Sequence, residues 1–362
     1  MKSRAKSILN FLLIFGTLAI VLIIGFSGND IGQTIDAIRS IPLRWVFCCL
    51  GAYVLFLFLE GLALFFFLRR QGARVTLRYC FFIAIIGQYY SNITPGASGG
   101  QPMQVWYLHK KGVSIGLGSS ALVVKLFCFQ FMLLVLGTLF WALYPGLIRE
   151  NLGGNMWILI VGYVYNAFVV SLLIAIGLNK HIVEWIVNTA IRIGAKLRIC
   201  KDPAASRVRW METVDRFHGS ITMLRHHPRD LIVQLLIGGA QLLSLMCVIF
   251  FLYKGFRLTG ATWGELIALG LMIYTSAAYT PLPGASGAQE GVFTLYLGKI
   301  FPYECHFSAL LLWRFFTYYV SLILGAIVTI GLTIREKQKP PAVQEAESIE
   351  EHEMLQEEQK EA

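Results

Sequence analysis

The chain has 362 residues, a formal net charge of +10 and a mean hydropathy of +0.63, and 14% of its residues are charged. Soluble domains carry about 25% charged residues, so this composition excludes an ordinary soluble domain and predicts an all-α polytopic membrane protein. Basic charge in such a protein mainly sets its orientation and contacts anionic lipid, and we therefore expect no nucleic-acid partner.

Apolar stretches long enough to cross a bilayer alternate with charged loops along the chain. A spanning helix needs about 20 mostly apolar residues. We predict about six such full spans, the first retained and not cleaved as a signal peptide, at residues 8–26, 45–68, 117–143, 156–178, 230–253 and 306–334. Two further apolar segments, 79–112 and 264–300, are each interrupted in the middle.

The two interruptions are copies of one phrase. Residues 95–101 read PGASGGQ, and residues 283–289 read PGASGAQ and are followed by Glu290. Glycine, proline and glutamine are tolerated at membrane depth only where the backbone is buried in protein or lines a cavity. A matched pair of such segments in two halves of a chain points to the central site of a transporter.

Basic residues predict the topology. Arg69, Arg70, Lys110 and Lys111 flank the first interrupted segment on both sides, so both of its ends should face the cytoplasm. The most basic loop, 180–229, should also be cytoplasmic, which makes the second interrupted segment enter from the outside. We therefore predict two opposed re-entrant helical hairpins in an inverted repeat, with halves at about 45–143 and 230–334.

One transmembrane domain should cover residues 1–335. Within it, the cytoplasmic loop 180–229 has apolar residues at helical spacing beside basic ones, which predicts an amphipathic helix on the inner leaflet. Residues 336–362 form an acidic tail that we expect to be disordered. The protein should lie in the cell (plasma) membrane as a multi-pass chain with both termini in the cytoplasm.

The repeated phrase can bind an anion. Ser98 with Gln101, and Ser286 with Gln289, match the capping-box pattern, so each turn should lead into a short helix whose N-terminus points to the bilayer middle. Two opposed helix N-termini, with free N–H groups and partial positive charge, suit a phosphate. The alternative is a close-packed turn that holds no ligand.

Ionisable residues inside apolar segments add to this site, because such residues usually face the bundle interior or a wet cavity. Arg314 lies deep in the last span and can pair with a phosphate. Lys125 can do the same or reach the cytoplasmic surface. Glu290 can cap its own helix, pair with Arg314, or bind a cationic head group or a proton, whereas Glu60 is the weaker candidate.

The predicted substrate-binding residues belong to the two turns and to the spans that flank them. They are Asn92, Thr94, Pro95, Gly96, Ser98, Gly99, Gln101, Gln104, Lys125, Pro281, Pro283, Gly284, Ser286, Gly287, Gln289, Glu290, Arg314 and Tyr318. We expect no catalytic residue, metal or cofactor. The turns lack the Lys-Ser/Thr that follows the glycines of a P-loop, which argues against ATP, and His226-His227 has no carboxylate or Cys partner at ligand spacing.

Three stretches resemble the membrane region of the lysylphosphatidylglycerol synthase/flippase family, of the multiple peptide resistance factor type. The resemblance extends over about residues 5–335. Its motifs are Asn92–Pro102 with Tyr107 and Lys110–Gly112, Thr280–Gly287 with Glu290 and Gly291, and Leu312–Arg314 with Tyr318 and Tyr319.

This resemblance implies an integral-membrane fold that moves aminoacylated phosphatidylglycerol between leaflets. In full-length relatives a C-terminal soluble domain makes that lipid from lysyl-tRNA, whereas here an acidic tail follows the last span, so we lean against lysyltransferase activity. The family often has an arginine after the first glycine turn, where this chain has Gln101 and Gln104. The anion contact would then fall to helix termini, Lys125 or Arg314.

The leading hypothesis is a flippase for an anionic or aminoacylated phospholipid, with an envelope lipid synthase and a second copy of the chain as candidate partners. One alternative is a small-solute transporter coupled to H⁺ or Na⁺ through Glu290, which a water-filled cavity closed to lipid would favour. Another is a non-transporting membrane partner of an envelope lipid enzyme, for which deleting 340–362 should abolish function.

Overall fold

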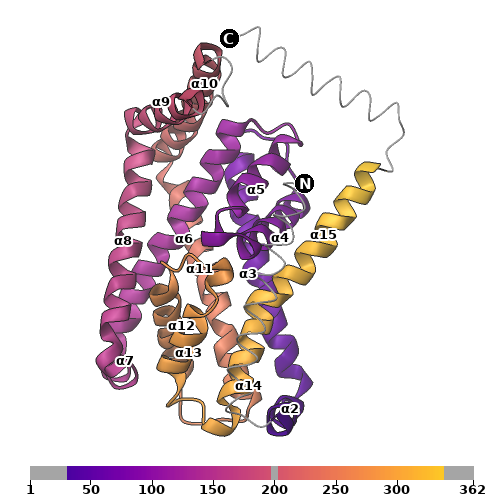
Figure 1. Cartoon of the computed structure of the whole chain (residues 1–362), viewed down its shortest axis with the longest axis vertical. Helices are drawn as coiled ribbons and strands as arrows, with labels where there is room; N and C mark the ends of the chain where they lie inside the picture. Colours follow the sequence, from indigo (N-terminus) through magenta and orange to yellow (C-terminus); the bar gives the residue numbers. More distant parts are fainter. Residues whose placement is uncertain (1–30, 197–202, 338–362) are drawn as a thin grey trace.

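The computed structural model describes residues 31–196 and 203–337, and this part of the chain is helical without strands (Figure 1). The predicted first span and most of the acidic tail lie outside the described residues. The helices are α2 (Ile31–Arg39), α3 (Leu43–Arg70), α4 (Leu77–Ile93), η1 (Pro95–Ala97), α5 (Gly100–His109), α6 (Ile115–Leu143), α7 (Pro145–Leu152), η2 (Gly153–Asn155), α8 (Met156–Leu178), α9 (Lys180–Lys196), α10 (Pro203–His226), α11 (Pro228–Gly255), α12 (Trp263–Ala277), η3 (Pro283–Ala285), α13 (Ala288–Leu297), α14 (Tyr303–Arg314), η4 (Phe315–Tyr319) and α15 (Val320–Lys337).

Five helical stretches in the described residues are long and apolar enough to cross a membrane. They are Leu43–Arg70, Ile115–Leu143, Pro145–Leu178, Pro228–Gly255 and Tyr303–Leu332. The first four contain the spans predicted from 45–68 onward and the fifth overlaps the predicted span 306–334, so a helical polytopic membrane protein is confirmed for this part of the chain. Their length follows from uninterrupted apolar sequence, because in lipid a helix satisfies its own backbone polar groups.

Helices α3 and α11 form the central pair of the bundle and run antiparallel (Figure 1). At one end, Arg70 at the close of α3 donates from Nε and Nη2 to the carboxylate of Asp230 near the start of α11, with a shortest distance of 2.7 Å. Along the interface, Ser244 Oγ donates to the carbonyl of Ala52 at 2.7 Å. Such bonds matter within a bilayer because its core holds no water to serve as an alternative partner.

Two helical hairpins pack against this pair from opposite ends of the bundle. The first is α4–η1–α5 in the upper half of Figure 1, and the second is α12–η3–α13 in the lower half. Their tips meet, since the N–H of Gly96 donates to the carbonyl of Pro281 at 2.7 Å. Segments that lie far apart in the sequence are thus joined directly by a backbone hydrogen bond.

The predicted capping boxes are wrong. Ser98 Oγ donates to the carbonyl of Pro95, and Ser286 Oγ donates to that of Pro283, both at 2.9 Å. Each serine therefore closes its own 3₁₀ turn instead of capping a helix, and α5 and α13 begin two residues later, at Gly100 and Ala288. In each copy the serine hydroxyl, which the capping-box pattern assigned to the start of the helix, is used by the three-residue turn instead.

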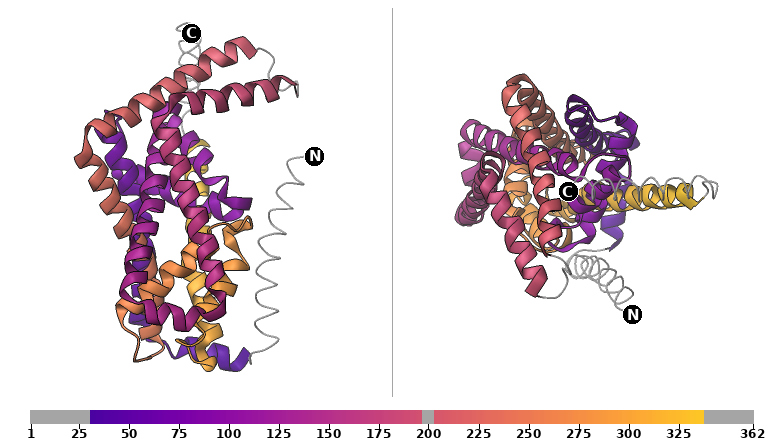
Figure 2. Two further views of the ribbon diagram at one scale, coloured as in Figure 1. Left: turned by 90° about the vertical axis from the view of Figure 1, so that its left-hand side faces the viewer. Right: turned by 90° about the horizontal axis from the view of Figure 1, so that it is seen from above.

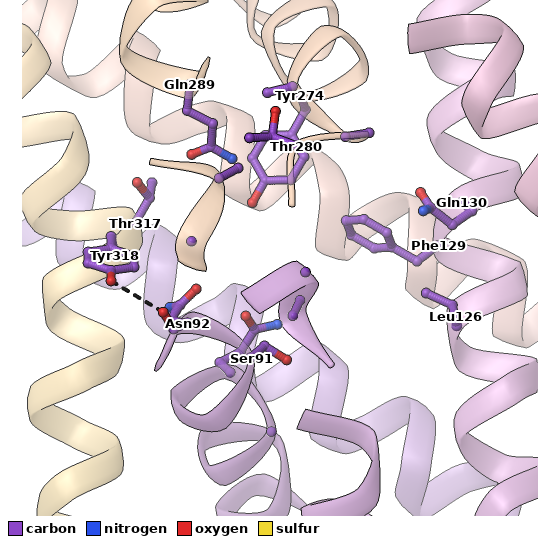
Figure 3. Close-up of a pocket in the computed structure, with 18 of the residues that line it drawn as sticks. Ser91, Asn92, Leu126, Phe129, Gln130, Tyr274, Thr280, Gln289, Thr317 and Tyr318 are labelled. Carbon is purple, nitrogen blue, oxygen red and sulfur yellow. Dashed lines mark hydrogen bonds between the residues drawn. The ribbon is translucent and has the colours of Figure 1, made fainter. Parts of the chain in front are cut away.

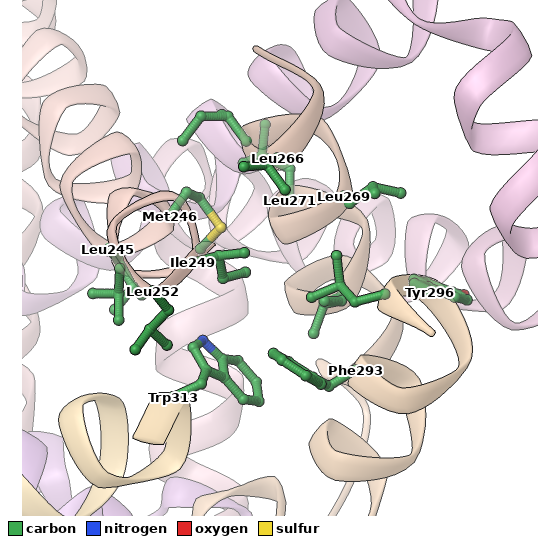
Figure 4. Close-up of a cluster of buried hydrophobic side chains, with 14 of the residues drawn as sticks. Leu245, Met246, Ile249, Leu252, Leu266, Leu269, Leu271, Phe293, Tyr296 and Trp313 are labelled. Carbon is green, nitrogen blue, oxygen red and sulfur yellow. The ribbon is translucent and has the colours of Figure 1, made fainter. Parts of the chain in front are cut away.

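A buried apolar cluster holds the second hairpin to the bundle (Figure 4). Leu245, Met246 and Ile249 of α11 pack against α12, and the ring of Phe293 on α13 stacks on Trp313 of α14 with centroids 4.9 Å apart. Trp313 precedes Arg314, so this packing also positions the arginine.

Helices α9 and α10 extend sideways from one end of the bundle, across the direction of the long helices (Figure 2, left). Lys180 at the start of α9 forms an ion pair with Asp215 of α10 and another with Glu184 at 3.4 Å. Trp185 of α9 is 67% exposed. The basic loop 180–229 therefore holds two helices where the sequence predicted one amphipathic helix.

Substituting Gly61 tests the contact between α3 and the first hairpin. A Cβ added there would lie 2.7 Å from the Cα of Phe81, which is backbone and cannot move aside. Gly61→Ala should lower stability by about 1–3 kcal/mol through overpacking, measured as a lower thermal midpoint in detergent. Gly51→Ala in the same helix has nothing within 4 Å and should leave the midpoint unchanged or slightly raised. Equal midpoints for the two variants would contradict the close approach.

Candidate functional site

A cavity of about 470 Å³ lies between the two hairpin tips and the facing helices α3, α6 and α11 (Figure 3). Gln241 lines it and occupies the middle of α11, which runs from Pro228 to Gly255. At 1.5 Å per residue this position is about 20 Å from each end of the helix. The cavity is therefore level with the centres of the spanning helices.

The repeated phrase starts with the same backbone turn in both hairpins, but Ser98 is helical where Ser286 is extended, and φ is −86° at Gly99 and 86° at Gly287. Gly96 and Gly284 both have φ of 59°, and the alanines that follow them, Ala97 and Ala285, have φ of 53° and 50°. The left-handed region costs an alanine about 1–2 kcal/mol. Two consecutive left-handed residues in each copy turn the chain back sharply, which places both tips at the cavity.

A first charge cluster joins four helices beside the first tip. It consists of Glu60 on α3, Gln88 on α4, Gln104 on α5 and Lys125 on α6. The carboxylate of Glu60 accepts hydrogen bonds from Lys125 Nζ at 2.5 Å, from Gln88 Nε2 at 2.9 Å and from Gln104 Nε2 at 3.2 Å. Glu60 is 3% exposed, so this pairing is what makes a carboxylate tolerable there.

A second charge cluster closes the second tip around Arg314. Its Nε donates to Glu290 Oε1 at 2.7 Å, and its Nη1 donates to Gln289 Oε1 at 2.6 Å. Both Nη atoms donate to the carbonyl of Gly284, at 3.3 and 3.2 Å, and Nη2 also donates to Ser286 Oγ at 3.1 Å. These bonds use the five N–H donors of the guanidinium. Arg314 is only 4% exposed.

Glu290 holds the second tip from the other side. Its Oε2 accepts the N–H of Gly287 at 2.7 Å while its Oε1 accepts from Arg314. Of the roles left open for Glu290, the structure shows both the helix cap and the pair with Arg314. In the first tip Thr94 takes the capping part, since its Oγ1 accepts the N–H of Gly99 at 2.8 Å.

A π-helical turn, η4, follows Arg314 and brings Thr317 and Tyr318 to the cavity. The ring of Tyr318 lies 4.7 Å from the guanidinium carbon of Arg314, and its hydroxyl donates to the carbonyl of Asn92 at 3.3 Å (Figure 3). A single π turn inside an α-helix is frequent at functional sites. Here it links the second charge cluster to the end of α4.

The structure separates the predicted site residues into two groups. Those that line the cavity are Asn92, Gly96, Gln101, Gln104, Lys125, Pro281, Gly284, Gln289, Arg314 and Tyr318. Those that shape or support the turns without lining it are Thr94, Pro95, Ser98, Gly99, Pro283, Ser286, Gly287 and Glu290. Their contact with a substrate remains a prediction.

Other cavity residues were not among the predicted site. Glu60, treated as the weaker charge, is the centre of the first cluster, and the signal for it was a lone carboxylate in an apolar helix that needed a partner. Aromatic and hydroxyl residues from separate helices carried no such signal: Tyr53, Phe56, Ser91, Phe129, Tyr165, Tyr274, Tyr279, Thr280 and Thr317.

Residues 7–325 match the family model described as "Lysylphosphatidylglycerol synthase TM region". The chain belongs to this family. A search among curated proteins found no match. Within the described ranges 31–196 and 203–337, no group of His, Cys, Asp and Glu could hold a metal ion.

Gly284→Ala tests whether the second tip needs the close contact with Tyr318. A Cβ at Gly284 would collide with the Tyr318 ring, whereas one at Gly96 would meet nothing within 4 Å, although both glycines have the same φ. Gly96→Ala should therefore cost only backbone strain of about 1–2 kcal/mol. Gly284→Ala should add overpacking of about 1–3 kcal/mol and lower the thermal midpoint further. A midpoint for Gly96→Ala that is lower than that of Gly284→Ala would contradict the close contact between Gly284 and Tyr318.

Proposed function

We propose that this protein is an integral membrane lipid translocase that moves an anionic or aminoacylated phospholipid between leaflets, with the head group in the cavity between the hairpin tips. The family name refers to lysylphosphatidylglycerol, which supports a phospholipid substrate. The observation that carries the proposal is the meeting of two hairpin tips with the same left-handed turn around one polar cavity, level with the centres of the spanning helices.

The edge of the cavity suits a lipid. Tyr279 and Leu282 line it and are 39% and 45% exposed, and Tyr165 on α8 is 38% exposed. These side chains form an apolar border on the flank of the bundle, where acyl chains could stay in the bilayer while the head group occupies the cavity. A water-soluble solute has no need of such a border, which weighs against the solute-transporter alternative.

An inverted repeat would account for movement between leaflets. Helices α3 and α11 are both 28 residues long, and each is followed by a hairpin whose second helix, α5 or α13, has 10 residues. Transporters built from such repeats expose a central site to either side by rocking one repeat against the other. The hydrogen bond between Gly96 and Pro281 lies where the two repeats would separate.

The orientation follows from one basic end of the bundle. Arg69, Arg74, Lys110 and Lys111 are exposed there, together with basic residues of α9 and α10 at the same end (Figure 1). Under the positive-inside rule this is the cytoplasmic end. The exposed Trp185 suits the membrane–water interface, where tryptophan is enriched.

Variants of the second charge cluster test the function. Arg314→Ala and Glu290→Gln should each slow leaflet exchange of labelled phospholipid in proteoliposomes by about tenfold or more. The physical reason is that each leaves a buried polar group of the second tip without its charged partner. Both variants should still be recovered in the membrane fraction after alkaline washing.

Arg149→Ala and Glu150→Gln are the matched controls, because both residues are exposed and lie in α7 away from the cavity. They should exchange lipid at the wild-type rate. Normal exchange by both variants of the second charge cluster would remove the proposed site.

A further inference from the structure

The carboxylates that line or border the cavity are already paired. Glu60 is bound to Lys125 at 2.5 Å, and Glu290 is bound to Arg314 at 2.7 Å. The side chains of Glu60 and Glu290 are only 3% and 11% exposed. Among the described residues that line the cavity, none offers an unpaired carboxylate to a cationic head group.

Each cation at the cavity is also paired, and what remains on the cationic side is a hydrogen-bond donor. The guanidinium of Arg314 spends its five N–H donors on the second tip, so it positions that tip. Lys125 Nζ has two acceptors among the described residues, Glu60 Oε1 and Gln104 Oε1, and an ammonium has three donors. Its side chain is 15% exposed and lines the cavity, which leaves one N–H for an anion.

Uncharged hydrogen-bonding groups make up most of the remaining polar lining. Gln241 is 4% exposed and has no side-chain hydrogen bond to any described residue, although it lines the cavity. A buried amide without a partner is costly, so it points to a ligand or water. The side chains of Gln130, Tyr274 and Gln289 also reach this space (Figure 3). Amides and hydroxyls can each donate and accept, which suits the hydroxyl groups of a polyol.

We propose that the cavity selects a phosphodiester head group that carries free hydroxyls, of the phosphatidylglycerol type, over its lysylated form. This inference rests on the proposed translocase function and names its substrate class. Lys125 contacts the phosphate and Gln241 with Gln130 contact the hydroxyls. The lysyl form adds two amino groups, and among the described residues that line the cavity no carboxylate is free to pair with them.

Leaflet exchange by the full chain in proteoliposomes tests the selectivity, with three lipids that carry the same acyl-chain fluorophore. Phosphatidylglycerol should exchange about tenfold faster than lysylphosphatidylglycerol. It should also exchange faster than phosphatidylethanol, which keeps the anionic phosphodiester but has no free hydroxyl.

Two variants separate the contributions of charge and of hydroxyl binding. Lys125→Gln leaves Glu60 unpaired and should shift the ratio of rates toward the lysyl lipid, whereas the double variant Glu60→Gln/Lys125→Gln should not. Gln241→Leu should slow phosphatidylglycerol but not phosphatidylethanol, and Gln130→Leu should repeat this result at a less buried position.

Each outcome decides one proposal. Exchange of the lysyl lipid as fast as phosphatidylglycerol, or equal loss of both anionic lipids in Gln241→Leu and Gln130→Leu, would overturn the selectivity while leaving the translocase intact. Failure of the folded wild-type protein to exchange any of the three lipids would overturn the translocase function and this inference with it.

Discussion

Arg314 supplies hydrogen bonds to a turn whose backbone groups could find no partner in the hydrocarbon of a bilayer. Each glycine-rich turn breaks an apolar helix and leaves carbonyl groups without helical partners, and an unsatisfied backbone group in lipid costs several kcal/mol. At the second tip, the guanidinium donates to the carbonyl of Gly284 and to the side chains of Gln289, Ser286 and Glu290. Glu290 also balances its charge and accepts the N–H of Gly287. This pair therefore stabilises the turn beside the cavity.

The two tips share a left-handed turn but differ in the backbone that follows it and in how they are held. Both copies of the phrase have the same pair of left-handed residues and the same serine hydrogen bond. Thr94 caps the first turn, and the buried charge near it is supplied by Glu60 and Lys125 from flanking helices. The same turn sequence is therefore combined with different charged partners at the two tips, and this makes the cavity asymmetric.

Much of the fold could be predicted because the signals were local. Apolar runs predict the five spanning helices found in the described residues, and the repeated Pro-Gly-Ala-Ser phrase marks both turns. The capping prediction failed because a serine hydroxyl can either accept an N–H at the start of a helix or donate to a carbonyl three residues earlier. Ser98 donates to the carbonyl of Pro95, and the sequence pattern does not say which bond forms. Glu60 was undervalued because its partners Lys125 and Gln104 come from other helices.

The sequence by itself determined that the chain is a helical membrane protein, where its spans lie and where two helices must break, since hydropathy and Gly-Pro content act over a few residues. Only the tertiary structure decided that the tips touch, that Arg314 donates its N–H groups to the second tip, and that Lys125 has two acceptors for its three N–H groups among the described residues. Those outcomes depend on which distant side chains share a low-dielectric space, where every donor and charge must find a partner.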